Sequence, residues 1–305
     1  MAIAQVAHAQ PGGPAPAQPT APSRPGRRYT PYLLLLPGVA WLLVFFAAPI
    51  LTLFGTSTQT RVPGTDQFVQ SFRLANYLDY AHEYATQFGR SFLYAGLATF
   101  AALVISFPLA YLIAFKAGRW RNLLLVLVVA PFFCSFILRT LAWKQILADD
   151  GYVVSALKFL HVLAPTQSLL ASSFAVVAGI TYNFLPFMTL PLYSSLERID
   201  PRLLEAGYDL YGGPFTVLRK ITFPLAMPGV VAGTLLTFIP AAGDYVNATL
   251  LGRQPATQMV GNVIQARFFD LVDYPAAATL SFILMAAILA LVLAYVRRAG
   301  TEELV

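Results

Sequence analysis

Six apolar segments recur along the chain, and each is close to the ~20 residues that a helix needs to cross the hydrocarbon core of a bilayer. Lipid offers no hydrogen-bond partner to an exposed backbone, so segments of this kind must be helical. Only 11% of the residues are charged, whereas soluble domains carry about 25%. The sequence therefore predicts an all-α membrane protein with six transmembrane helices, at residues 32–56, 91–115, 122–147, 170–196, 225–251 and 276–296.

Proline recurs inside these predicted spans, at positions 37, 49, 108, 131, 186, 191 and 240. Within a bilayer, a proline is tolerated where neighbouring helices satisfy the backbone groups that it frees. The number of prolines predicts broken, curved helices arranged around a pathway, although each proline taken alone is also consistent with a simple packing kink.

The two ends of the chain differ in composition from the spans. Residues 1–30 are rich in Ala, Pro and Gly and predict a disordered tail. A short tail is expected at residues 299–305, which leaves residues 31–298 as the membrane domain. Lys and Arg gather on the side of the N-terminus, twelve against five on the other side. This asymmetry predicts that both termini and the loop of residues 198–224 are cytosolic, and it accounts for the net charge of +6 without invoking nucleic acid.

The loop between the fourth and fifth spans carries strong local signals. Asp200-Pro201 is a favourable helix start, with Asp as the N-cap and Pro at the first helical position. A helix is expected over residues 202–210, Gly212-Gly213 would end it, and a second helix is expected over residues 215–222.

The first of these short helices has features of a docking element. Leu203, Gly207 and Leu210 share one predicted face, and the small Gly207 would let a partner clasp the helix in a groove, with Glu205 as its anion. An amphipathic helix resting on lipid is the alternative, since Arg219 and Lys220 fit that setting equally well.

The same loop resembles the EAA signature of ABC importer permeases, whose pattern is E-A-A-x-x-x-G followed nine residues later by I-x-L-P. Here Glu205-Ala206-Gly207 stands for E-A-A, and Ile221-Thr222-Phe223-Pro224 stands for I-x-L-P. Gly207 replaces the second Ala, Tyr211 occupies the usual Gly position with Gly212 next to it, and Phe223 replaces Leu. The departure at Tyr211 implies a reshaped turn.

Other segments resemble the spermidine/putrescine permease family. They are RTLAW from Arg139, NFLPFMTLPLYSSLERID from Asn183, FIPAAGDYV from Phe238 and MVGNVIQARF from Met259. Together they cover most of residues 120–296. Relatives with other solutes share these segments, so they are less specific than the loop.

The resemblance implies a type I importer (MetI-like) permease fold in a bacterial inner membrane. It also implies a cytosolic ATPase dimer, an extracytoplasmic solute-binding protein and a second permease subunit. That subunit is either another copy of this chain or, as the resemblance favours, a homologous chain. The sequence has no Gly-x-x-x-x-Gly-Lys-Ser/Thr loop, so ATP and Mg²⁺ are expected on the ATPase, with no cofactor, metal or catalytic site in this chain. The residues that the resemblance assigns to ATPase coupling are Glu205, Ala206, Gly207, Asp209, Leu210, Gly212, Ile221 and Pro224.

Asp244 is the sharpest candidate for the pathway, because it is an acid within an otherwise apolar predicted span. A charge at the centre of a membrane helix is costly and usually faces a cavity. Carboxylate, amide and aromatic groups together suit an ammonium solute. The expected pathway residues are Asp244, Tyr245, Asn247, Tyr182 and Asn183, with Arg139 and Trp143 in an external gate. Alternatively, Asp244 forms an internal salt bridge with Arg139 or Lys144, and the tyrosines are packing or interfacial residues.

The predicted function is therefore that of a permease subunit of an ATP-driven polyamine importer. One alternative keeps the importer and changes the solute to an amino-acid-like or opine-like compound. A different class, a self-sufficient secondary carrier, would use Asp244 as a proton or cation site.

Overall fold

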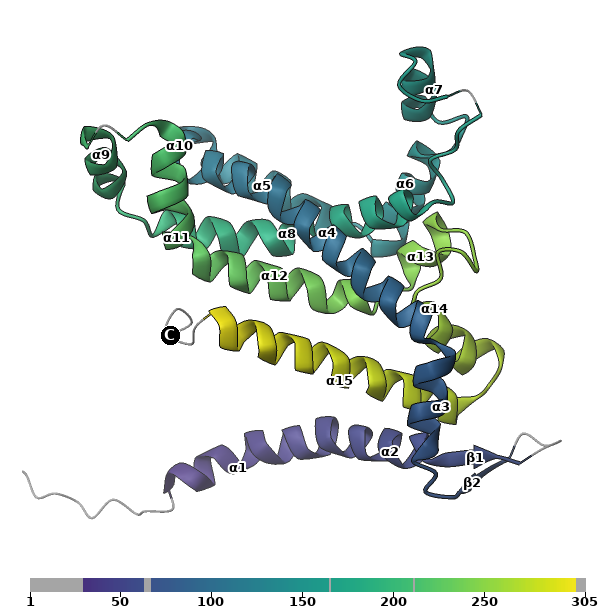
Figure 1. The fold of residues 1–305 in the computed structure, drawn as a ribbon. Helices are drawn as coiled ribbons and strands as arrows, with labels where there is room; N and C mark the ends of the chain where they lie inside the picture. The colour runs from purple at the N-terminus through teal and green to yellow at the C-terminus, as the bar shows by residue number, and fades with distance from the viewer. Residues whose placement is uncertain (1–29, 63–66, 165, 211, 300–305) are drawn as a thin grey trace, which may run out of the picture. The chain divides into compact units, whose positions relative to one another are not determined.

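The computed structural model describes residues 30–62, 67–164, 166–210 and 212–299, and these are mostly helical (Figure 1). The predicted tails lie almost wholly outside the described residues. The chain divides into two units, residues 1–51 and residues 52–305, and each is described by itself.

The first unit holds most of the first predicted span. It contains α1 (Thr30–Leu42), the π-helical turn η1 (Leu43–Ala47) and the start of α2 (Ala48–Ser57). Pro37 lies inside α1 without ending the helix. The span predicted at residues 32–56 is therefore confirmed as a helical stretch.

The second unit continues from α2 into a short antiparallel hairpin, in which Gln59 of β1 (Gln59–Arg61) faces Gln70 of β2 (Phe68–Gln70). This hairpin is the one departure from the all-helical prediction within the described residues. The helical elements that follow are α3 (Ala75–Glu83), α4 (Ala85–Tyr111), η2 (Leu112–Lys116), η3 (Gly118–Trp120), α5 (Arg121–Val129), η4 (Ala130–Phe133), α6 (Phe136–Ile146), α7 (Tyr152–Phe159), α8 (Ser173–Glu197), α9 (Pro201–Asp209), α10 (Pro214–Val217), η5 (Leu218–Thr222), α11 (Phe223–Leu225), α12 (Met227–Ala242), α13 (Val246–Leu251), α14 (Val260–Gln265), η6 (Ala266–Asp270) and α15 (Tyr274–Ala299).

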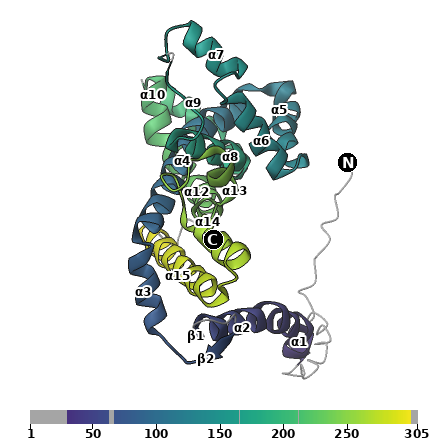
Figure 2. The ribbon, with the colours of Figure 1, turned by 90° about the vertical axis from the view of Figure 1, so that its right-hand side faces the viewer.

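The core of this unit is the packing of α4, α8 and α12 against one another (Figures 1 and 2). Small residues allow the close approach. A Cβ atom at Gly229 of α12 would lie 2.6 Å from the carbonyl oxygen of Pro191 in α8, and one at Gly233 would lie 2.8 Å from Sδ of Met188. Membrane helices associate through such close packing because lipid removes the hydrophobic drive between them.

The third predicted span is broken. Residues 118–133 and α6 are bent by 97° with respect to each other. Pro131 lies in the first turn of η4, and Cys134 adopts an extended backbone with ψ of 146°. The prolines predict broken helices, and this is confirmed for residues 122–147, because the chain turns sharply close to Pro131, which lacks a backbone donor.

The fifth predicted span is also broken, and the break leaves Asp244 between two helices. Residues 214–225 and α12 are bent by 66°, α12 ends at Ala242, and α13 starts only at Val246. Within the described residues, four other helices are long and apolar enough to cross a membrane, and counting each bent pair as one span gives up to six, the number predicted. The fifth of these covers residues 214–242 instead of the predicted residues 225–251.

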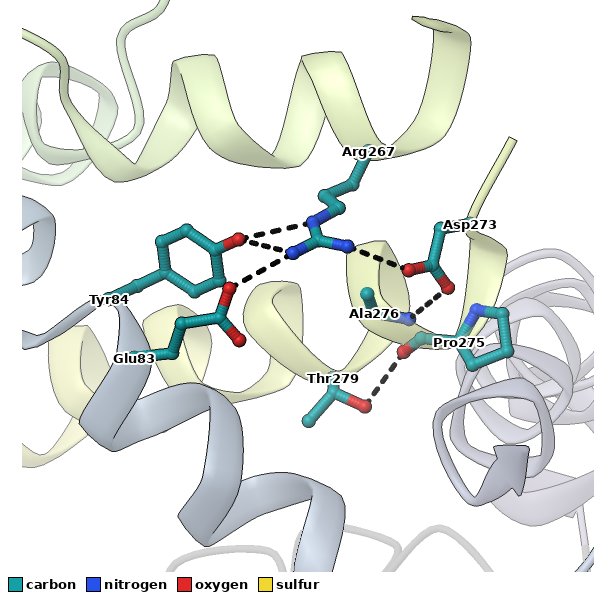
Figure 3. A network of polar contacts seen from close by, with 7 residues as sticks. All are labelled: Glu83, Tyr84, Arg267, Asp273, Pro275, Ala276 and Thr279. Carbon is teal, nitrogen blue, oxygen red and sulfur yellow. Dashed lines mark hydrogen bonds and ion pairs between the residues drawn. The ribbon is translucent and has the colours of Figure 1, made fainter. Parts of the chain in front are cut away.

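Arg267 fixes one corner of the second unit (Figure 3). Its guanidinium lies 3.0 Å from a carboxylate oxygen of Asp273 and 3.1 Å from one of Glu83, and it donates to the hydroxyl of Tyr84. Burial raises the pKa of the Tyr84 phenol, and the hydrogen bond from Arg267 opposes this effect without cancelling it. The network ties the junction of α3 and α4 to the start of α15. At this junction α3 ends at Glu83 and α4 begins at Ala85.

Candidate functional site

Asp244 lies in the non-helical break between α12 and α13, and it is only 6% exposed. Its Oδ1 accepts the backbone N–H of Asn247 at 2.9 Å, and its Oδ2 accepts the Asn247 side-chain amide at 3.0 Å. A side chain that bonds to a nearby backbone N–H competes with a continuous helix. The expectation of an acid at the centre of a helix is therefore corrected, since Asp244 instead caps the start of α13.

Asn247 joins this carboxylate to two other helices. Its Oδ1 accepts the amide of Asn183 of α8 at 3.0 Å and the hydroxyl of Thr140 of α6 at 3.3 Å. The Asn183 amide also donates to Thr140 Oγ1 at 3.1 Å. We call Thr140, Asn183, Asp244 and Asn247 the polar cluster. All four residues are buried, and three of them were predicted for the pathway.

Thr140 is the member of the polar cluster that sequence reasoning missed. Its signal was available, because a hydroxyl follows Arg139 inside an apolar stretch. The alternative of an internal salt bridge to Asp244 finds no support, since the described residues contain no ion pair between Asp244 and Arg139 or Lys144.

A second asparagine holds the break from the other side. Asn262 of α14 donates to the carbonyl oxygen of Tyr245 at 3.0 Å and to the hydroxyl of Thr249 at 2.7 Å. Its Oδ1 accepts the backbone N–H of Met259 at 3.0 Å. Next to it, a Cβ atom at Gly261 would lie 2.5 Å from the carbonyl oxygen of Gly243. Asn262 is thus a second donor to the carbonyl oxygen of Tyr245, which also accepts the backbone N–H of Thr249 at 2.9 Å, and it holds α14 against the start of α13.

The remaining predicted pathway residues form separate contacts. Trp143 and Tyr182 pack together, with ring centroids 5.4 Å apart. The guanidinium of Arg139 lies over Phe132 at 5.3 Å and Phe136 at 5.6 Å. Tyr245 is 46% exposed. The structure thus brings Asn183, Asp244 and Asn247 together, and it pairs Trp143 with Tyr182.

The loop from α9 to α11 follows the predicted plan. The Asp200 side chain accepts the backbone N–H of Arg202 at 2.9 Å, and Pro201 opens α9. α10 begins at Pro214, directly after the two glycines. Tyr211, which departs from the EAA pattern, lies outside the described residues.

Gly207 faces the loop itself. A Cβ atom on Gly207 would lie 2.5 Å from Cδ1 of Ile221 and 3.3 Å from a methyl group of Val217. Leu203 and Leu210 are instead 49% and 83% exposed. Of the three residues predicted to share one face, only Gly207 is therefore buried against the rest of the loop. The short helix packs inward through Leu204 and Gly207, and a partner that clasps α9 would meet its exposed residues.

The outward face of α9 combines charge with apolar surface. Among the predicted coupling residues, those exposed to solvent are Glu205, Ala206, Asp209, Leu210 and Pro224, whereas Gly212 and Ile221 are half-buried. Phe215 of α10 is a further exposed apolar side chain of the loop, in addition to Leu203 and Leu210. An exposed face of this mixed character suits contact with another protein.

The fold and the bent spans define a multi-pass membrane permease domain. Residues 85–299 match the model of the family described as "Binding-protein-dependent transport system inner membrane component". The chain belongs to this family and is a multi-pass inner-membrane protein.

Several characterised proteins are similar over most of their length. The spermidine/putrescine transport system permease protein PotB of Escherichia coli is 35% identical over 85% of this chain and 94% of its own length. The PotB protein of Haemophilus influenzae is 34% identical over 85% of this chain and 90% of its own length. The inner membrane ABC transporter permease protein YdcU of E. coli is 29% identical over 89% of this chain and 90% of its own length.

Solved structures confirm the predicted fold. A chain of a bacterial ABC transporter that imports the polysaccharide alginate superposes with a TM-score of 0.65, at 17% identity, over 90% of this chain and 96% of that one. A chain of the MetNI methionine ABC transporter superposes with a TM-score of 0.53, at 16% identity, over 70% of this chain and 94% of that one. The fold is therefore that of type I ABC importer permeases.

Proposed function

We propose that this chain is the membrane-spanning permease subunit of an ATP-driven importer for a polyamine such as spermidine or putrescine, which a solute-binding protein delivers. The observation that carries the proposal is identity of 34–36% with relatives named as spermidine/putrescine permeases, over 81–85% of the chain. In this proposal the chain forms half of the pathway, and a homologous permease forms the other half.

In the same proposal, the loop of residues 198–224 is the contact with a cytosolic ATPase dimer, and both termini lie in the cytosol. The exposed anions Glu205 and Asp209, next to the exposed Leu210, support this role for α9. Nucleotide and Mg²⁺ belong to the ATPase, whose movement α9 passes on to the spans. Gly207, Gly212 and Ile221 then act indirectly, because they hold α9 in place from inside the loop.

Asp244 is the proposed anionic contact for the solute. A carboxylate with amide neighbours and aromatic rings in nearby elements matches the chemistry of an alkylammonium ion, through charge-assisted hydrogen bonds and cation–π contact. Tyr245, Tyr182 and Trp143 are the proposed aromatic groups, and Arg139 with Trp143 is the proposed gate.

A second solute class is also considered, since the name of the similar permease YdcU states no solute. An importer with the same architecture for an amino-acid-like or opine-like compound is that second candidate.

The test is the ATPase activity of the co-expressed complex in lipid, with its solute-binding protein and one candidate solute at a time. Stimulation by putrescine or spermidine, weakened by Asp244→Asn, is the expected result. A response to a different solute alone would discard the polyamine assignment and keep the importer. Solute movement by this chain without any ATPase would overturn the proposal altogether.

A further inference from the structure

The carboxylate of Asp244 has an unusual set of partners. It is 6% exposed, and the described residues bring no cation within ion-pair distance of it. Asn247 donates to it twice, from the backbone N–H and from the amide, and the backbone N–H of Ala248 is a further neutral donor. A buried carboxylate normally requires a positive partner, because losing its hydration is costly. Here a neutral amide takes that position.

The polar cluster as a whole is short of hydrogen-bond donors. Asn183 is 1% exposed, both of its amide donor contacts are used within the cluster, and its Oδ1 is buried without a donor. An ammonium group has three donors and no acceptor. A cation of this kind would supply the donors and the charge that the cluster lacks.

We propose that the Asn247 amide is a stand-in for the ammonium group of the solute, so that arrival of the cation at Asp244 displaces this amide and unlocks α13 from α6 and α8. The proposal rests on the proposed function, because it takes the solute to be an alkylammonium ion that reaches Asp244.

The exchange has a physical direction. Hydrogen bonds from an ammonium ion to a carboxylate are roughly twice as strong as those between neutral groups, so the cation outcompetes the amide for Oδ2 once it arrives. A neutral or anionic solute has no such advantage and leaves the amide in place. Because Asp244 is buried, the exchange takes place when the α13 end of the bundle opens.

The same amide holds three elements together, and this makes its displacement consequential. Asn247 Oδ1 accepts from both Asn183 and Thr140 while its nitrogen bonds Asp244. A Cβ atom at Gly179 of α8 would lie 2.8 Å from Asn247 Oδ1, so α8 passes directly over this side chain. The amide therefore cannot rotate away from Asp244 without losing its bonds to α6 and α8.

The test uses Asn247→Leu in the complete complex, because leucine has nearly the same shape and lacks the amide. Removing the Asn247 amide is expected to raise the ATPase rate without solute by about 5–10-fold, the factor that corresponds to about one net hydrogen bond. The half-maximal concentration of putrescine or spermidine should fall, since no amide has to be displaced. Thr237→Val is the matched control: its buried hydroxyl has no partner within the described residues, and both readouts should stay unchanged.

Thr140→Val removes one hydroxyl that bonds Asn247. It tests the inference if the complex with Asn247→Leu does not assemble. It should raise the solute-free ATPase rate by about 2–3-fold, as expected for one weak bond. The inference is overturned if the wild-type complex responds to polyamines but neither variant changes the solute-free rate or the half-maximal concentration. An equal fall of the solute-free and the solute-stimulated ATPase rates, as a purely structural role would produce, also overturns it. If the wild-type complex does not respond to polyamines, the proposed function is wrong, and so is this inference.

Discussion

The α9 loop and the polar cluster are both irregular regions between apolar spans, yet they treat their polar groups in opposite ways. The loop turns Glu205 and Asp209 outward and packs its glycine inward. The polar cluster turns Asp244, Asn183 and Asn247 inward and covers them. A region that presents its charge is suited to contact with another protein, and a region that covers its charge is suited to a change of state that uncovers it.

Each region has one tightly packed glycine, and the two glycines differ in the kind of atom that they contact. Gly207 meets the flexible end of the Ile221 side chain, whereas Gly261 meets the backbone carbonyl oxygen of Gly243. The loop can therefore accommodate an added methyl group by rotation of a side chain, while the break in its closed arrangement cannot. This difference leads to four predictions, given in order of decreasing effect.

Reversal of the charge on the outward face should have the largest effect. Glu205→Lys is expected to lower solute-stimulated ATPase activity by about 30-fold or more, the scale of a hot-spot residue at an interface. The measurement is co-purification of the ATPase together with its activity in lipid. Asp270→Lys, a charge reversal of an exposed acid in η6, should keep the ATPase bound. Retention of full coupling in Glu205→Lys would contradict the docking role of α9.

The two glycines test the contrast in rigidity. Gly261→Ala should destabilise the protein by about 2–4 kcal/mol, because its Cβ atom would overlap backbone atoms that cannot rotate away. Gly207→Ala should lie within about 1 kcal/mol of the wild type, since Ile221 can change rotamer and Ala favours the helix. Thermal unfolding in detergent measures both variants. Equal melting temperatures for the two would show that the break is as adaptable as the loop.

Removal of the buried charge tests the polar cluster alone. Asp244→Asn keeps an oxygen for the backbone N–H of Asn247 and loses the negative charge. The half-maximal polyamine concentration should rise by about 10–100-fold, as expected for the loss of a charge-assisted hydrogen bond. Titration of ATPase activity with putrescine gives this value, and gel filtration checks assembly. An unchanged titration curve would separate Asp244 from solute binding.

The smallest effect is expected at the corner that Arg267 fixes, outside both regions. Arg267→Gln should lower stability by about 0.5–1.5 kcal/mol, because its side chain is 22% exposed and has several partners. Arg73→Gln is the control, since Arg73 and Asp79 form a pair that is 52% and 58% exposed and should contribute almost nothing. A loss of solute-stimulated ATPase activity greater than the loss of stability would assign this corner a role in transport.

The predictions made from sequence succeeded where the causes were local. Span length and hydropathy predicted six helical spans because the bilayer requires internal backbone hydrogen bonds. The cap by Asp200 and the glycine turn before α10 were predictable because they depend on neighbouring residues alone. The burial of Gly207 was not predictable from local sequence, because it depends on contacts with Val217 and Ile221, which lie 10 and 14 residues further along the chain.

The sequence by itself thus determined the class of the protein, the positions of its spans and the plan of the α9 loop. Only the tertiary structure decided that the fifth span breaks at Asp244, that Thr140, Asn183 and Asn247 meet there, and that Asn262 supports the break. The physical reason is distance along the chain, since Thr140 and Asn247 are 107 residues apart in sequence yet 3.3 Å apart at their bonded atoms. Contacts of this kind come from the packing of α6, α8 and α13, which no local pattern of residues encodes.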